Sequence, residues 1–99
     1  MTITALNSEE ISKQLELLNE SLEVNWILES GKLTKTFFFG NFIEAFGFMG
    51  KVALYAEKVN HHPEWFNVYK TVKVQLITHE AEGISEKDFN LALKMEAYS

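Results

Sequence analysis

Residues 64–78 read EWFNVYKTVKVQLIT and predict a β-hairpin. Its second half alternates between apolar and polar side chains, the period of two that is typical of a strand with one buried face. The apolar face would carry Val72, Val74 and Leu76. We therefore expect strands at residues 64–69 and 71–78.

A second hairpin is predicted upstream. Residues 22–29 also alternate, which would make them a strand with Leu22, Val24, Trp26 and Leu28 on one face. Ser30-Gly31 is typical of a tight hairpin turn, and residues 32–39 form the return strand.

Three helices complete the pattern. Residues 8–20 are amphipathic and start at Ser8, or at Asn7 with Glu10 three residues on. A second helix, of about 16–18 residues, starts after Asn41 with Glu44 in a similar capping pattern. The last helix is capped by Ser85 with Asp88, and its predicted inward side chains are Phe89, Ala92 and Leu93.

Two glycines, Gly47 and Gly50, interrupt the predicted second helix, where each costs about 1 kcal/mol relative to alanine. Close packing against the sheet or against another subunit would explain them, and so would flexibility. The element order is α-β-β-α-β-β-α. This order predicts one α+β domain over residues 1–99, a two-layer fold with a four-stranded antiparallel sheet and helices on one face.

Composition excludes several functions. A net charge of −5 without a basic stripe argues against direct nucleic-acid binding. No apolar run is long enough for a membrane span, and the N-terminus lacks the pattern of a signal peptide. The absence of cysteine excludes disulfides and thiolate chemistry. We expect a cytoplasmic protein, also nuclear if the source is a eukaryote.

The three histidines, His61, His62 and His79, are the strongest chemical signal. A hairpin turn centred near Lys70 places Trp65 opposite Gln75 and position 61 opposite position 79, so all three imidazoles should meet at one end of the hairpin. Imidazole titrates near neutral pH, which favours acid–base chemistry or ligand binding. A three-histidine zinc site and ordinary surface or core histidines remain alternatives.

Other candidate residues lie nearby. Glu57 ends the long helix one turn before His61 and could orient a histidine or bind a ligand, unless it is simply a solvated acid. Asp88 is either a site carboxylate or a helix cap. Trp65 is either an apolar wall for a flat ring or an ordinary core aromatic.

The chain also resembles a known family, the pterin-4a-carbinolamine dehydratases, from about Ser8 onward. The resemblance is carried by Glu57-Lys58, the run HHPEWFNVY at 61–69, Thr78-His79-Glu80, Gly83-Ile84-Ser85 and Asp88. It implies a cofactor-free lyase that converts 4a-hydroxytetrahydropterin to quinonoid dihydropterin, recycling the pterin of aromatic amino acid hydroxylases. It further implies the same two-layer fold, assembled as a dimer or a tetramer.

The resemblance also implies residue roles. His61 and His79 would be the acid–base pair, with His62 in the same catalytic cluster and more concerned with substrate binding. The substrate site would further include Glu57, Pro63, Trp65, Thr78 and Asp88, and no metal.

Animal members of this family also serve as the dimerisation cofactor of a homeodomain transcription factor. A protein-binding module is therefore the alternative function, and a metal-binding regulator is a third. Three clustered histidines favour the enzyme, because a binding module has no need of them.

Overall fold

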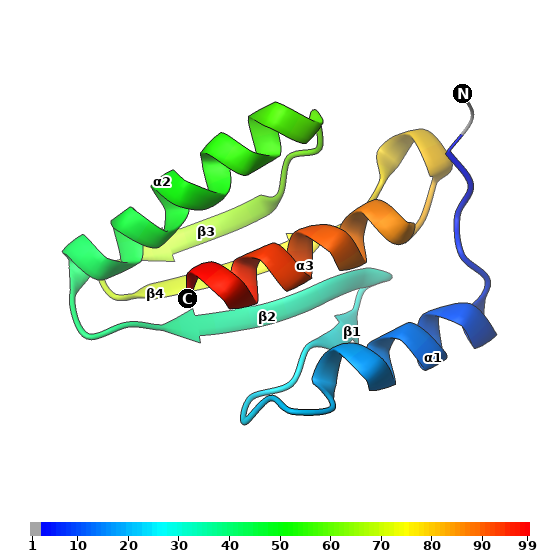
Figure 1. Ribbon diagram of the computed structural model, residues 1–99, viewed down its shortest axis with the longest axis horizontal. Helices are drawn as coiled ribbons and strands as arrows, with labels where there is room; N and C mark the ends of the chain where they lie inside the picture. Colours follow the sequence, from blue (N-terminus) through cyan, green and yellow to red (C-terminus); the bar gives the residue numbers. More distant parts are fainter. Residues whose placement is uncertain (1–2) are drawn as a thin grey trace.

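The computed structural model describes residues 3–99. Its elements are α1 (Ser8–Asn19), β1 (Ile27–Glu29), β2 (Lys32–Phe38), α2 (Phe42–Val59), β3 (Glu64–Val68), β4 (Thr71–Leu76), the 3-10 turn η1 (His79–Ala81) and α3 (Glu86–Tyr98). The strands form an antiparallel sheet in the order β1-β2-β4-β3, with the helices packed on one side (Figure 1). The predicted α+β class and element order are confirmed, and η1 is an addition.

The core lies between the sheet and the helices. Val72, Val74 and Leu76 of β4 point into it, as their alternation predicts. Helix α3 packs against both α2 and α1 and buries positions 88, 89, 91, 92 and 95, which confirms the predicted inward positions of Phe89 and Ala92. The predicted inward position of Leu93 is wrong: its side chain lies outside this stripe and is 56% exposed.

The first hairpin is shorter than expected. Residues 22–26 are not a strand, and the first strand comprises only Ile27–Glu29. The reason is Asn19, whose side chain donates to the carbonyl of Trp26 at 2.9 Å and accepts from its N–H at 2.8 Å. These bonds stabilise a loop in place of a strand ladder, and only Trp26 of the predicted apolar face is fully buried. The turn itself is confirmed, with positive φ at Ser30 and Gly31.

The second hairpin has a register one residue away from the prediction. Trp65 pairs with Val74, and Glu64 pairs with Gln75. The two turn residues are Tyr69 and Lys70, so the turn is centred between them instead of on Lys70. Position 61 therefore does not pair with position 79, and His79 lies in η1 beyond the end of β4.

The helix starts agree with their capping signals. Asn7 with Glu10 and Ser85 with Asp88 each form a complete capping box. Asn41 accepts from the N–H of Glu44, but the Glu44 carboxylate accepts from Gly40 rather than from Asn41.

The two glycines of α2 are exposed in the described chain. A Cβ added at Gly47 or at Gly50 would meet no atom within 4 Å. The predicted close packing of these glycines against the sheet is therefore wrong, because they lie on the outward side of the helix. Packing against another subunit stays a prediction.

Candidate active site

The three histidines gather at one end of the β3–β4 hairpin. They line a hollow of about 290 Å³ together with Asn60, Ile77 and Glu80. His61 and His62 follow α2, whereas His79 opens η1 after β4. The expected convergence of the imidazoles is therefore present, although η1, and not a strand pairing, brings His79 there.

Asn60 positions the first two histidines by ending α2 sharply. Its backbone is left-handed, with φ 53° and ψ 46°, a conformation that asparagine tolerates better than most residues. The N–H of Asn60 then donates to the carbonyl of Glu57 at 3.3 Å, and that of His61 donates to the carbonyl of Ala56 at 3.0 Å. This helix end turns the chain so that His61 points into the protein and His62 remains at the surface.

His61 is paired with a buried carboxylate. Its Nε2 lies 2.6 Å from Oδ1 of Asp88, and the two side chains are only 6% and 0% exposed. The other oxygen of Asp88 accepts from the Ser85 N–H at 2.9 Å and from the Thr78 hydroxyl at 2.8 Å. Asp88 is thus the helix cap that the sequence suggested and also contacts His61, whereas its role as a site carboxylate stays a prediction.

Thr78 lies behind this pair instead of at the hollow. It is completely buried, and its hydroxyl bonds to Ser85 Oγ at 2.7 Å as well as to Asp88. A buried polar network with every member paired is stiff, because each lost bond would leave an unsatisfied group. Thr78 therefore holds Asp88 in place.

His62 forms an exposed pair with Glu57. Its Nε2 lies 2.8 Å from Oε1 of Glu57, and the two side chains are 57% and 81% exposed. Glu57 is therefore solvated and also contacts a histidine, and the role of orienting that histidine stays a prediction.

His79 pairs with a carboxylate that the sequence did not suggest as a site residue. Its Nε2 lies 3.1 Å from Oε2 of Glu64, while Lys32 donates to Oε1 of the same carboxylate at 2.6 Å. The hydrogen bond from Lys32, and then that from His79, lower the pKa of Glu64 below its ordinary value of 4.5. Only the strand order could have revealed this group, because Lys32 and Glu64 lie on strands separated by β4.

All three imidazoles therefore share one arrangement. Each uses Nε2 to contact a carboxylate: Asp88, Glu57 and Glu64 respectively. A carboxylate in its ionised form only accepts hydrogen bonds, and Nε2 is then the donor nitrogen of each pair. Nδ1 is the nitrogen that remains to take a proton from a ligand or to give one to it.

The remaining predicted site residues lie outside the histidine hollow. Pro63 is half-buried directly before β3. Trp65 shares the helix-facing side of the sheet with Val74 and packs against the core. Its position agrees with the core alternative rather than with a wall of the hollow.

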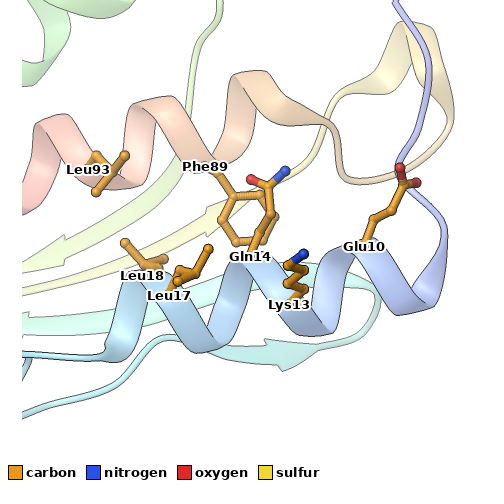
Figure 2. Close-up of a pocket in the computed structure, with 7 residues that line it drawn as sticks. All are labelled: Glu10, Lys13, Gln14, Leu17, Leu18, Phe89 and Leu93. Carbon is orange, nitrogen blue, oxygen red and sulfur yellow. The ribbon is translucent and has the colours of Figure 1, made fainter.

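A larger groove than the histidine hollow lies elsewhere. It has a volume of about 530 Å³ and runs between α1 and α3, where Leu17, Phe89 and Leu93 form its walls (Figure 2). No histidine reaches it, and its charged groups are Glu10 and Lys13 at the rim. The histidines therefore lie at the smaller hollow and not at this groove.

Metal binding and membrane insertion have separate geometric requirements. Within residues 3–99, no three histidine, aspartate or glutamate side chains gather as the ligands of a metal ion would. None of the helices in this range combines the length and the apolar character that crossing a bilayer requires.

The fold and the site together define an α+β protein with a carboxylate-supported histidine cluster. Residues 4–98 match the family model described as pterin 4 alpha carbinolamine dehydratase. A protein of Prochlorococcus marinus (strain MIT 9303), provisionally named pterin-4-alpha-carbinolamine dehydratase, is 48% identical over 92 residues, which cover 93% of this chain and 91% of that protein. A protein of Chelativorans sp. (strain BNC1) with the same provisional name is 51% identical over 96 residues, covering 95% and 93%.

A solved structure agrees with these relatives. The transcriptional coactivator/pterin dehydratase from Brucella melitensis is 42% identical and superposes with a TM-score of 0.85, covering 96% of this chain and 98% of that one. The chain belongs to the pterin 4 alpha carbinolamine dehydratase family. Its enzyme class is that of the family, a dehydratase and therefore a hydro-lyase.

Proposed function

We propose that this chain dehydrates 4a-hydroxytetrahydropterin to quinonoid dihydropterin by histidine acid–base catalysis, in the recycling of the pterin used by aromatic amino acid hydroxylases. One observation carries the proposal. Three imidazoles line one hollow, and each has Nε2 bound to a carboxylate and Nδ1 left for a substrate.

The reaction is an elimination of water. The C4a–oxygen bond breaks as the N5 lone pair forms a C4a=N5 double bond, one proton is delivered to the departing hydroxyl, and N5 loses its proton. No electrons leave the substrate, so the step requires no redox cofactor. Imidazoles near their titration range suit both proton transfers, each of which typically contributes about 10²- to 10⁴-fold.

The geometry favours separate roles for the histidines. His61 is held by the buried Asp88 after α2, whereas His79 lies on η1, so two different elements bring an imidazole to the same hollow. We assign them to the two proton transfers. His62, with Glu57, would bind the substrate. Pro63, Trp65 and Thr78 would shape the site from outside the hollow.

A coupled assay tests this function. An aromatic amino acid hydroxylase generates the carbinolamine in situ, and quinonoid formation is followed by ultraviolet absorbance. We expect acceleration by the wild type and its loss in a His61→Ala, His79→Ala double variant with an unchanged circular dichroism spectrum. A double variant with near-normal kcat would remove both histidines from the mechanism.

A protein-binding role is the second candidate, and exposed apolar residues on α2 favour it. Ile43, Phe46 and Leu54 are 82%, 60% and 77% exposed. We propose that this surface contacts a second copy of the chain in a dimer or tetramer, or a transcription-factor partner. Sedimentation of Leu54→Glu tests the first option, with the exposed Leu17→Glu on α1 as the matched control. An unchanged mass for Leu54→Glu would argue against self-association through this surface.

The cytoplasmic location stays a prediction, which cell fractionation would test.

A further inference from the structure

One carboxylate connects the central sheet to the third histidine. Glu64 of β3 accepts from Lys32 of β2 through Oε1 at 2.6 Å, and its Oε2 lies 3.1 Å from Nε2 of His79. The two contacts use different oxygens. The carboxylate is therefore held from both sides.

We propose that Glu64, anchored by Lys32, is a positioning residue that orients the His79 ring toward the hollow. The inference deepens the proposed function and rests on it, because it assigns the group that sets the direction of His79. Neither Glu64 nor Lys32 lines the hollow, so both act through the histidine.

The need for such a group follows from the exposure of His79. Its side chain is 74% exposed, and an exposed side chain on a short turn keeps much of its rotamer freedom. A hydrogen bond from Nε2 to a fixed acceptor restricts the ring to orientations in which Nδ1 points away from Glu64. His61 has the corresponding contact with Asp88, but there the protein interior also surrounds the ring, whereas His79 depends on Glu64 alone among these restraints.

Lys32 holds the Glu64 carboxylate in place. It lies in β2, and β4 separates that strand from β3, so its ammonium reaches across the sheet to meet Glu64. Its hydrogen bond is the largest cause of the lowered pKa of Glu64, which reflects the close contact between the two groups. The charged groups that face Glu64 are Lys32 and His79, and its strand partner Gln75 is neutral.

The same sheet offers a matched control. Lys73 and Glu29 form another pair at 3.0 Å, with each side chain 44% exposed, close to the 40% of Glu64. Glu29 has no contact with a histidine. Glu29→Gln therefore removes a similarly exposed carboxylate that is paired with a lysine on the same sheet, but without a link to His79.

The test is a double-variant cycle in the coupled dehydratase assay. We expect Glu64→Gln to lower kcat about five-fold with little change in KM, as suits an exposed charged contact that acts on the chemical step. Glu29→Gln should retain wild-type kcat. In a His79→Ala background, Glu64→Gln should cause no further loss, because the residue that it positions is gone.

Two substitutions of Lys32 test its role as the anchor of Glu64. Lys32→Met should lower kcat as Glu64→Gln does, whereas Lys32→Arg should retain most of the wild-type kcat. These variants keep the inference testable if Glu64→Gln does not fold.

Three outcomes would contradict the inference. If Glu64→Gln kept the wild-type kcat while His79→Ala lost most of it, this inference alone would be overturned. An equal loss from Glu64→Gln with and without His79 would also overturn it, because the effect would then be structural. Full activity in His79→Ala would overturn both this inference and the proposed role of His79.

Discussion

Asp88 contacts Nε2 of His61 through one carboxylate oxygen and caps helix α3 through the other. The direction of the imidazole is thereby tied to the start of a helix that packs against both α1 and α2. A substitution that disrupts the cap of α3 would therefore also disturb the position of His61. A substitution that removes the contact with His61 would also destabilise the start of α3.

Replacing Asp88 by asparagine should lower both the stability of the fold and the activity of the site. The asparagine amide has the same shape as the carboxylate but no negative charge. It therefore weakens the contacts that Asp88 makes with the Thr78 hydroxyl, the Ser85 N–H and His61. We expect a loss of about 2 kcal/mol in the free energy of unfolding and at least about ten-fold in kcat. Urea denaturation and the coupled assay measure the two effects.

Ser85→Ala is the control for Asp88→Asn. It removes the capping hydroxyl and should cost about 1 kcal/mol of stability, yet it leaves the contact between Asp88 and His61. Its kcat should therefore remain close to that of the wild type. Full activity in Asp88→Asn would show that His61 needs no carboxylate.

Thr78 offers a test of the buried network without any change of charge. Thr78→Val keeps the volume and removes the hydroxyl, which leaves Asp88 and Ser85 each with one partner fewer. We expect a loss of about 1–2 kcal/mol in the free energy of unfolding. Thr78→Ser keeps the hydroxyl and should lose less, so equal losses in the two variants would point to packing instead.

Asn60 should tolerate glycine but not valine. Its positive φ is strained for a β-branched side chain, so Asn60→Val should cost about 1–3 kcal/mol, whereas Asn60→Gly should be close to neutral. Thermal unfolding measures both. Because this residue sets the exit of His61 from α2, Asn60→Val should also lower kcat in molecules that remain folded. Equal stability of the two variants would contradict the importance of the left-handed helix end.

The Lys32–Glu64 pair predicts a pH effect on stability. The pKa of Glu64 is lowered from 4.5 in the folded chain, so its contribution is present above that value and is lost as pH falls through the lower folded value. The carboxylate is 40% exposed and the contact is screened, which limits the effect to less than about 1 kcal/mol. Lys32→Met should flatten this part of the stability curve below about pH 5, as measured by urea denaturation.

Local signals in the sequence predicted the features that local chemistry determines. Ser30-Gly31 gave the first turn, and Ser85 with Asp88 gave the start of α3. The three histidines could be expected at one end of the hairpin because two of them precede β3 and one follows β4. This spacing did not fix the register of the β3–β4 hairpin to better than one residue, because the register depends on where the tight turn is centred.

The remaining features depend on contacts between distant segments. The predicted strand at 22–29 was wrong because the Asn19 side chain occupies both backbone groups of Trp26, which alternation cannot show. Glu64 was missed because its partners come from β2 and η1, and their proximity requires the strand order. Side-chain bonds across long separations are therefore the part of this site that sequence patterns do not contain.

The three carboxylates that hold the histidines differ in their access to water, and this difference makes ionic strength a selective probe of the site. Dissolved salt screens exposed charges strongly and buried ones little. Where the imidazoles are protonated, rising salt should therefore weaken the exposed His62–Glu57 and His79–Glu64 pairs more than the buried His61–Asp88 pair. An experimenter can thus act on two of the three histidines without changing a single residue.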